Sequence, residues 1–210
     1  MIDHAVTLAG ERSSSGPALL LEKSRLHRSL GQPEAALQAL SWIDRHPEKP
    51  DLRLLLRIEI ERGGALCDLG RHREVEKLST RVRKAAESFP RERSRLLCVE
   101  GRVAAGLGRL EEAASILQRA HADPDERAVA DLALLTLEIA PLYAREGKDT
   151  ELKGLGEQAL RFAASSFLGR EAAATLKLVG RLAAEGKLST ERAVQFASDF
   201  SRASLMGTKR

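Results

Sequence analysis

Apolar residues recur at helical spacing along nearly the whole of this 210-residue chain. The clearest stretch follows Pro90, where Leu96, Val99, Val103 and Leu107 lie three or four positions apart, as on one face of an α-helix. The pattern predicts helices and no strands. The predicted helices are 2–10, 17–30, 33–46, 51–69, 71–88, 91–107, 109–121, 125–146, 149–166, 168–185 and 189–204.

Single glycines interrupt these helices at a nearly constant interval. Successive glycines are 39, 38, 39 and 39 residues apart, and each lies in a similar stretch, such as LGRHREV or LGRLEEA. Glycine ends a helix well because it adopts the left-handed conformation without a Cβ penalty. The five positions are Gly31, Gly70, Gly108, Gly147 and Gly186. Self-similarity at a period of this size predicts a repeat architecture.

The repeat predicts an all-α fold: a right-handed superhelical solenoid of about five helix–turn–helix hairpins with a 38–39 residue period. We expect a single domain over residues 1–210. Its hairpins would occupy about 17–50, 51–90, 91–124, 125–166 and 167–204, after an N-terminal half-unit at 1–16. In the last hairpin the pattern slips by two residues, and Ser189 is the predicted N-cap of the final helix.

The third hairpin resembles the tetratricopeptide (TPR) pattern, with small residues at the helix crossing, a turn glycine and alanine in the second helix. The matching residues are Leu97, Gly101, Ala104, Gly108, Leu110, Ala113, Leu117, Ala120 and Pro124. The TPR period is 34 residues, so this chain is TPR-like, with helices longer by about one turn. The resemblance implies a binding surface on the first helix of each hairpin.

Residues 128–200 show a narrower resemblance, to the C-terminal repeat region of bacterial helix-turn-helix regulators. This implies the sensing or partner-binding part of a transcription-control system. We expect residues 1–16 to hold at most one short helix, so that a partner would supply DNA binding.

Composition fits a soluble helical protein, because hydrophobic residues make up 43% and charged residues 30% of the chain. No apolar run is long enough to span a bilayer, and the N-terminus has no secretory pattern. Cys67 and Cys98 are the only thiols and are expected to pack as small hydrophobes. We therefore expect a cytoplasmic protein without membrane contact.

Enzymatic chemistry finds little support in the sequence. No two histidines have metal-ligand spacing, no Cys-x-x-Cys occurs, and no glycine loop suits a phosphate. The histidines are His4, His27, His46, His72 and His121. We expect no catalysis, no metal and no cofactor.

Several arginines lie where TPR proteins bind partners, on the first helices of the hairpins. By that analogy the concave surface would be basic in the early hairpins and apolar later, and would bind an acidic or amphipathic helix or tail. The candidate partner-binding residues are Arg25, Arg28, Arg57, Arg95, Arg102, Leu134 and Leu137. The alternative is that these arginines only cover neighbouring aliphatic surface. The leading expectation is an adaptor or scaffold, and the oligomeric state stays open.

A second basic feature lies in the second hairpin, where residues 71–95 carry nine Lys or Arg against four Glu. Arg73, Lys77, Arg81 and Lys84 recur every three or four positions and should form a stripe on one helix face. Such a stripe can bind phosphates, although aromatic residues are only 3% of the chain, too few to stack bases. A solvated helix face is the simpler interpretation, and nucleic-acid contact is the alternative.

Overall fold

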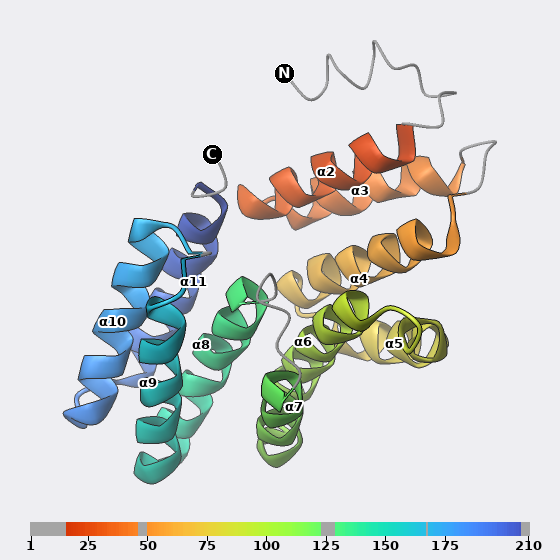
Figure 1. Cartoon of the computed structure of the whole chain (residues 1–210). Coiled ribbons are helices and arrows are strands. Elements are labelled where there is room, and N and C mark those ends of the chain that lie inside the picture. Colours follow the sequence, from red (N-terminus) through yellow and green to blue (C-terminus); the bar gives the residue numbers. More distant parts are fainter. Residues whose placement is uncertain (1–15, 46–49, 123–128, 167, 207–210) are drawn as a thin grey trace. The chain divides into compact units, whose positions relative to one another are not determined.

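In a computed structural model of the chain, residues 16–45, 50–122, 129–166 and 168–206 are described (Figure 1). These residues contain helices and no strand. The helices are α2 (Gly16–Ser29), α3 (Pro33–Asp44), α4 (Leu52–Asp68), α5 (His72–Ala86), α6 (Pro90–Gly106), α7 (Leu110–Ala122), α8 (Val129–Glu146), α9 (Asp149–Ala163), α10 (Arg170–Ala184) and α11 (Thr190–Met206). The all-α prediction is confirmed for this part of the chain.

Each helix predicted within these residues is present, and its ends differ from the prediction by at most three residues. The predicted helix 2–10 and the start of the helix predicted at 125–146 lie outside the described residues. None of the described helices has the length and apolar character that crossing a membrane requires.

The five turn glycines share one backbone conformation. Their φ angles lie between +66° and +75°, in the left-handed region that favours glycine. At Gly108, the glycine N–H donates to the carbonyl of Ala105 at 2.9 Å, and the N–H of Arg109 donates to that of Ala104 at 2.8 Å. The same two bonds recur at the other four turns, and they define the Schellman motif. The predicted helix–glycine–helix turn is therefore confirmed at all five positions.

The chain divides into two compact units, residues 1–99 and 100–210, and the division falls within α6. In the N-terminal unit, α2 packs on α3 and α4, α3 packs on α4, and α4 packs on α5. The core between α2, α3 and α4 is aliphatic and contains Leu20, Leu21, Leu40, Ile43 and Ile58.

The C-terminal unit ends in four helices that pack in a cycle. Helix α8 packs on α9, α9 on α10, α10 on α11, and α11 returns to α8. The side chain of Phe200 on α11 is fully buried. Helix α11 therefore has two neighbours in this unit, α10 and α8.

Glycines also allow close helix contacts. A Cβ atom placed on Gly156 of α9 would lie 2.6 Å from the Cβ of Ala183 on α10, and one placed on Gly180 would lie 2.9 Å from the carbonyl oxygen of Gly156. Gly101, predicted at a helix crossing, faces Leu135 in the same way, at 2.6 Å. These glycines set the approach of neighbouring helices.

The two-residue slip in the last turn has a local cause. Leu188 is buried between Gly186 and the start of α11, whereas the other turn glycines are followed by one residue before the next helix. The Oγ of Ser189 accepts a bond from the N–H of Arg192 at 3.4 Å. Ser189 therefore caps α11, as predicted.

Candidate functional site

Three of the predicted partner-binding arginines come together in the N-terminal unit, from three different helices. Arg25 lies on α2, Arg57 on α4 and Arg95 on α6, and we call them the arginine cluster. Burial lowers the pKa of the Arg25 guanidinium, and the positive charges of Arg95 and Arg57 lower it further, against the opposing effect of Glu22 and Glu61. The cluster therefore concentrates positive charge at a partly buried place.

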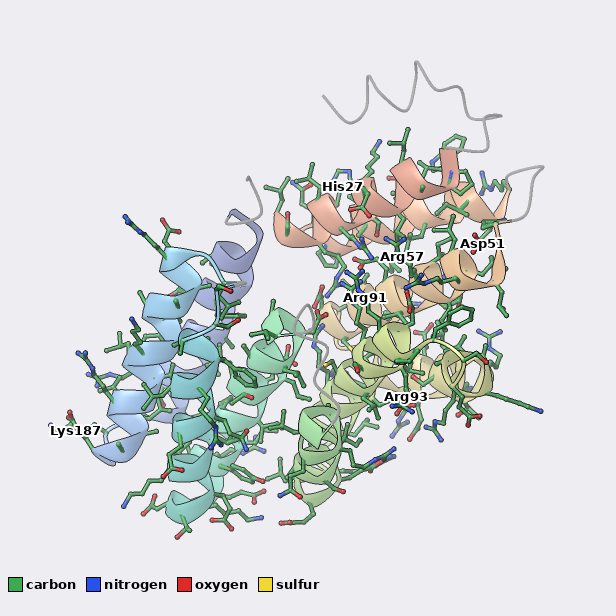
Figure 2. All side chains as sticks on the ribbon, viewed as in Figure 1. His27, Asp51, Arg57, Arg91, Arg93 and Lys187 are labelled. Atoms are coloured by element: carbon green, nitrogen blue, oxygen red, sulfur yellow. The ribbon has the colours of Figure 1, made fainter. Side chains whose placement is uncertain are left out.

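Two members of the arginine cluster, Arg25 and Arg57, lie close to carboxylates of the same unit. Nη1 of Arg25 donates to Oε1 of Glu22 at 2.6 Å. Arg57 reaches from α4 toward α2 (Figure 2), where its Nη2 lies 3.5 Å from the same Glu22 oxygen. Nε of Arg25 is 3.6 Å from Oε2 of Glu61, which is too long for a hydrogen bond. This buried nitrogen has no hydrogen-bond acceptor.

Arg28, also a predicted partner-binding residue, is held inside the unit. Its Nη1 donates to Oε1 of Glu61 at 3.0 Å, and its Nε donates to Oδ2 of Asp68 at 2.8 Å. Glu61 is only 5% exposed. The guanidinium lies over Gly64 of α4, where a Cβ would be 2.5 Å from Nη1. We therefore infer that Arg28 stabilises the fold by joining α2 to α4.

The remaining predicted residues belong to the C-terminal unit. Arg102 is 8% exposed, and its Nε donates to Oε2 and Oε1 of Glu138 on α8 at 2.7 and 2.9 Å. Leu137 is 1% exposed and belongs to the core, while Leu134 is half-buried. Arg102 and Leu137 are thus engaged within the protein, and we assign them to the fold as well.

The carboxylates that pair with these arginines were not predicted from the sequence. Arg28 pairs with Glu61 33 residues later, Arg53 with Glu92 39 residues later, and Arg102 with Glu138 36 residues later. Each pair joins the first helices of successive hairpins, and Glu61 and Glu92 are buried. A basic residue followed by an acid about one period later was the available signal.

The basic stripe lies on the exposed face of α5. Arg73, Lys77, Arg81 and Lys84 are all exposed on α5, whose buried residues include Val75 and Leu78. None of the four basic side chains forms an ion pair with a described residue. In contrast, Arg71 at the start of the helix donates to both oxygens of Glu74, at 2.6 and 2.7 Å.

Groups that could support other chemistry are sparse in the described part of the chain. It contains no group of three His, Cys, Asp or Glu residues that could hold a metal ion. Cys67 and Cys98 are buried, as expected for cysteines that pack as small hydrophobes. Trp42 of α3 is 45% exposed, with the guanidinium of Arg45 5.9 Å from its ring centre.

No protein-family model matches this chain, and no curated protein or solved structure gives a match. The resemblance to TPR proteins therefore rests on the residues of the repeat itself.

Proposed function

We propose that this chain is a non-catalytic protein-interaction module, a solenoid of about five TPR-like hairpins, and that its arginine cluster binds an acidic segment of a partner protein. The recurrence of one turn geometry at five places supports the repeat. We also propose a cytoplasmic setting for this chain, as expected from the sequence.

The observation that carries the proposal is the gathering of three guanidinium groups at one place, where burial and the positive charges of Arg95 and Arg57 lower the pKa of Arg25. The side chain of Arg57 is 36% exposed, so a ligand can reach it. A carboxylate from a partner that binds there would offset part of this positive charge. Guanidinium groups suit this ligand because their planar fork accommodates both oxygens of a carboxylate.

The three helices that supply the cluster also indicate the shape of the ligand. Arg25, Arg57 and Arg95 come from α2, α4 and α6, so a ligand that contacts all three must cross successive hairpins. A peptide helix or an extended tail can do so, and it can place acidic side chains at suitable intervals. We therefore propose an acidic or amphipathic peptide as the ligand.

The direct test is an array of acidic peptides of about 12–15 residues, each beside a counterpart in which Asn and Gln replace Asp and Glu. Peptides that bind are labelled and titrated with the full chain by fluorescence anisotropy. We expect the acidic forms to bind and the amide forms to fail. Arg57→Gln should weaken binding about tenfold, the effect of losing one charge-assisted bond.

Arg170→Gln is the matched control, since Arg170 is an exposed arginine of α10. It should leave the affinity unchanged. Failure of every acidic peptide to bind, or equal effects of the two substitutions, would contradict the proposal. The solenoid itself is tested by small-angle scattering, where an elongated particle is expected and a compact sphere would rule it out.

A further inference from the structure

The basic stripe of α5 is a surface that the arginine cluster does not explain. We infer that Arg73, Lys77, Arg81 and Lys84 form a second interaction surface, whose ligand is the phosphate backbone of a double-stranded nucleic acid. This inference is independent of the proposed peptide binding, because the two sets share no residue.

The four side chains share one face of the helix. At about 100° per residue, positions 73, 77, 81 and 84 fall within an arc of about 80°. The buried Val75, Ser79 and Ala86 lie on the opposite side, and the buried Leu78 lies between the two faces. The stripe is therefore presented to solvent as one continuous row about 16 Å long.

The cations of the stripe form no ion pairs within the described residues, although Lys77 is close enough to Glu74 to help Arg71 lower the pKa of that carboxyl group. None of its four cations lies within ion-pair distance of a carboxylate in the described residues, unlike Arg25, Arg28, Arg57 and Arg102. From Arg71 to Glu87 there are six basic residues and three glutamates. Of these glutamates, Glu74 is already bonded to Arg71 through both oxygens. A polyanion would therefore meet a net positive face.

The surroundings of the stripe favour phosphate over a protein ligand. The exposed large hydrophobic residues of the described chain all lie outside α5, so α5 offers no apolar anchor. Protein interfaces derive most of their affinity from buried aromatic and other anchor residues. Binding to a phosphate backbone depends instead on cations that displace counterions, and it needs no apolar contact.

Geometry and composition favour a duplex over a single strand. Single-strand binding uses aromatic side chains as stacking platforms, and α5 contains no aromatic residue. A row of about 16 Å corresponds to roughly five phosphates along one strand of a duplex, at about 3.4 Å of axis per phosphate. Four cations in such a row can contact one backbone without reading the sequence.

The test uses the full chain and a fluorescein-labelled, mixed-sequence DNA duplex of about 20 base pairs. Anisotropy is measured between about 50 and 200 mM salt. We expect binding that weakens with salt, with a log–log slope near −3.6 for four phosphate contacts. The stripe variant, Arg73→Gln/Lys77→Gln/Arg81→Gln/Lys84→Gln, should lose at least about tenfold in affinity and flatten the slope.

A matched control variant removes the same four charges from the C-terminal unit. Lys153, Arg161, Arg170 and Lys177 are exposed there, and none forms an ion pair with a described residue. Their replacement by Gln should change affinity less than about twofold. Circular dichroism confirms that both variants remain helical.

Three results would overturn the inference. The first is a duplex that fails to bind the wild-type chain at about 50 mM salt. The second is an equal loss in the stripe and control variants, which would indicate a response to net charge alone. The third is displacement of the duplex by poly-glutamate at an equal concentration of charge, which would indicate an acidic protein as the ligand.

Discussion

The guanidinium of Arg28 lies directly over Gly64, at a distance that a side chain on residue 64 would not permit. From this position it bonds Glu61, one turn before Gly64, and Asp68, one turn after it. The glycine thus makes room for a salt bridge that joins α2 to α4. The neighbouring Gly63 has a different role, since it faces Val99 of α6 and allows a close helix contact there.

Gly64→Val should therefore destabilise the protein by displacing this guanidinium. The buried Glu61 would lose a partner, and the expected cost is about 2 kcal/mol in the free energy of unfolding. Denaturant unfolding measures it. In an Arg28→Ala background the same substitution should cost markedly less, because the space is then free. Additive costs in the double variant would show that the two residues do not interact.

At the turn glycines, a substitution should destabilise the protein through its backbone conformation and not through steric contact. A Cβ on Gly108 would meet nothing within 4 Å, yet its φ is +75°. Gly108→Val should cost about 1 kcal/mol or more, through backbone strain alone. Gly154 of α9 has equally open surroundings without a positive φ. Gly154→Ala should be neutral or stabilising by up to about 1 kcal/mol. An unchanged melting temperature for Gly108→Val would contradict the left-handed turn.

At the contact between α9 and α10, in contrast, a substitution should destabilise the protein through steric contact. Gly156→Ala places a methyl group 2.6 Å from the Cβ of Ala183 and 3.3 Å from the carbonyl oxygen of Gly180. We expect a loss of about 1–3 kcal/mol, since the helices must move apart. Gly154→Ala, two residues earlier in the same helix, is again the control. Equal stability of the two variants would mean that the helices do not approach this closely.

The stability of the protein should depend on pH in the alkaline range because of Tyr143, the only tyrosine of the chain. Burial raises the pKa of its hydroxyl, Glu111 raises it further, and Lys148 opposes them. The folded protein thus keeps the phenolic proton to higher pH than the unfolded chain, whose pKa is about 10. The contribution of Tyr143 to stability is present below that pH and is lost as pH rises through the folded pKa.

Absorbance of the phenolate reports this titration without interference from lysines. The midpoint in the native protein should exceed that in denaturant, and Tyr143→Phe should abolish the signal. A native midpoint at or below the denatured one would show that the side chain is not buried as the structure has it.

Local features of the fold could be predicted from the sequence, whereas pairing between helices could not. The glycine turns depend on residues adjacent in the chain, so Gly108 and its neighbours were sufficient to predict them. The bonding of Arg102 to Glu138 depends on how α6 faces α8, which periodicity does not determine. For the same reason Arg28 and Leu137 were predicted as ligands for a partner, although the structure engages both internally.

The solvent face of α5 was predictable because it follows from helical spacing within one element. The return of α11 to α8 was not, since it depends on the angle at which the last turn leaves α10.

An NMR titration of the arginine Nε–H groups with an acidic peptide selected on the array tests most directly whether the arginine cluster binds such a peptide. The resonances are assigned by Arg→Lys substitution at each position. We expect the Nε–H signals of Arg25, Arg57 and Arg95 to shift on binding, with the largest shift at Arg57, whose side chain is 36% exposed. Those of Arg28 and Arg102 should stay in place, because their carboxylate partners are internal. A bound peptide that leaves the Nε–H signals of the arginine cluster unchanged would contradict binding at the cluster.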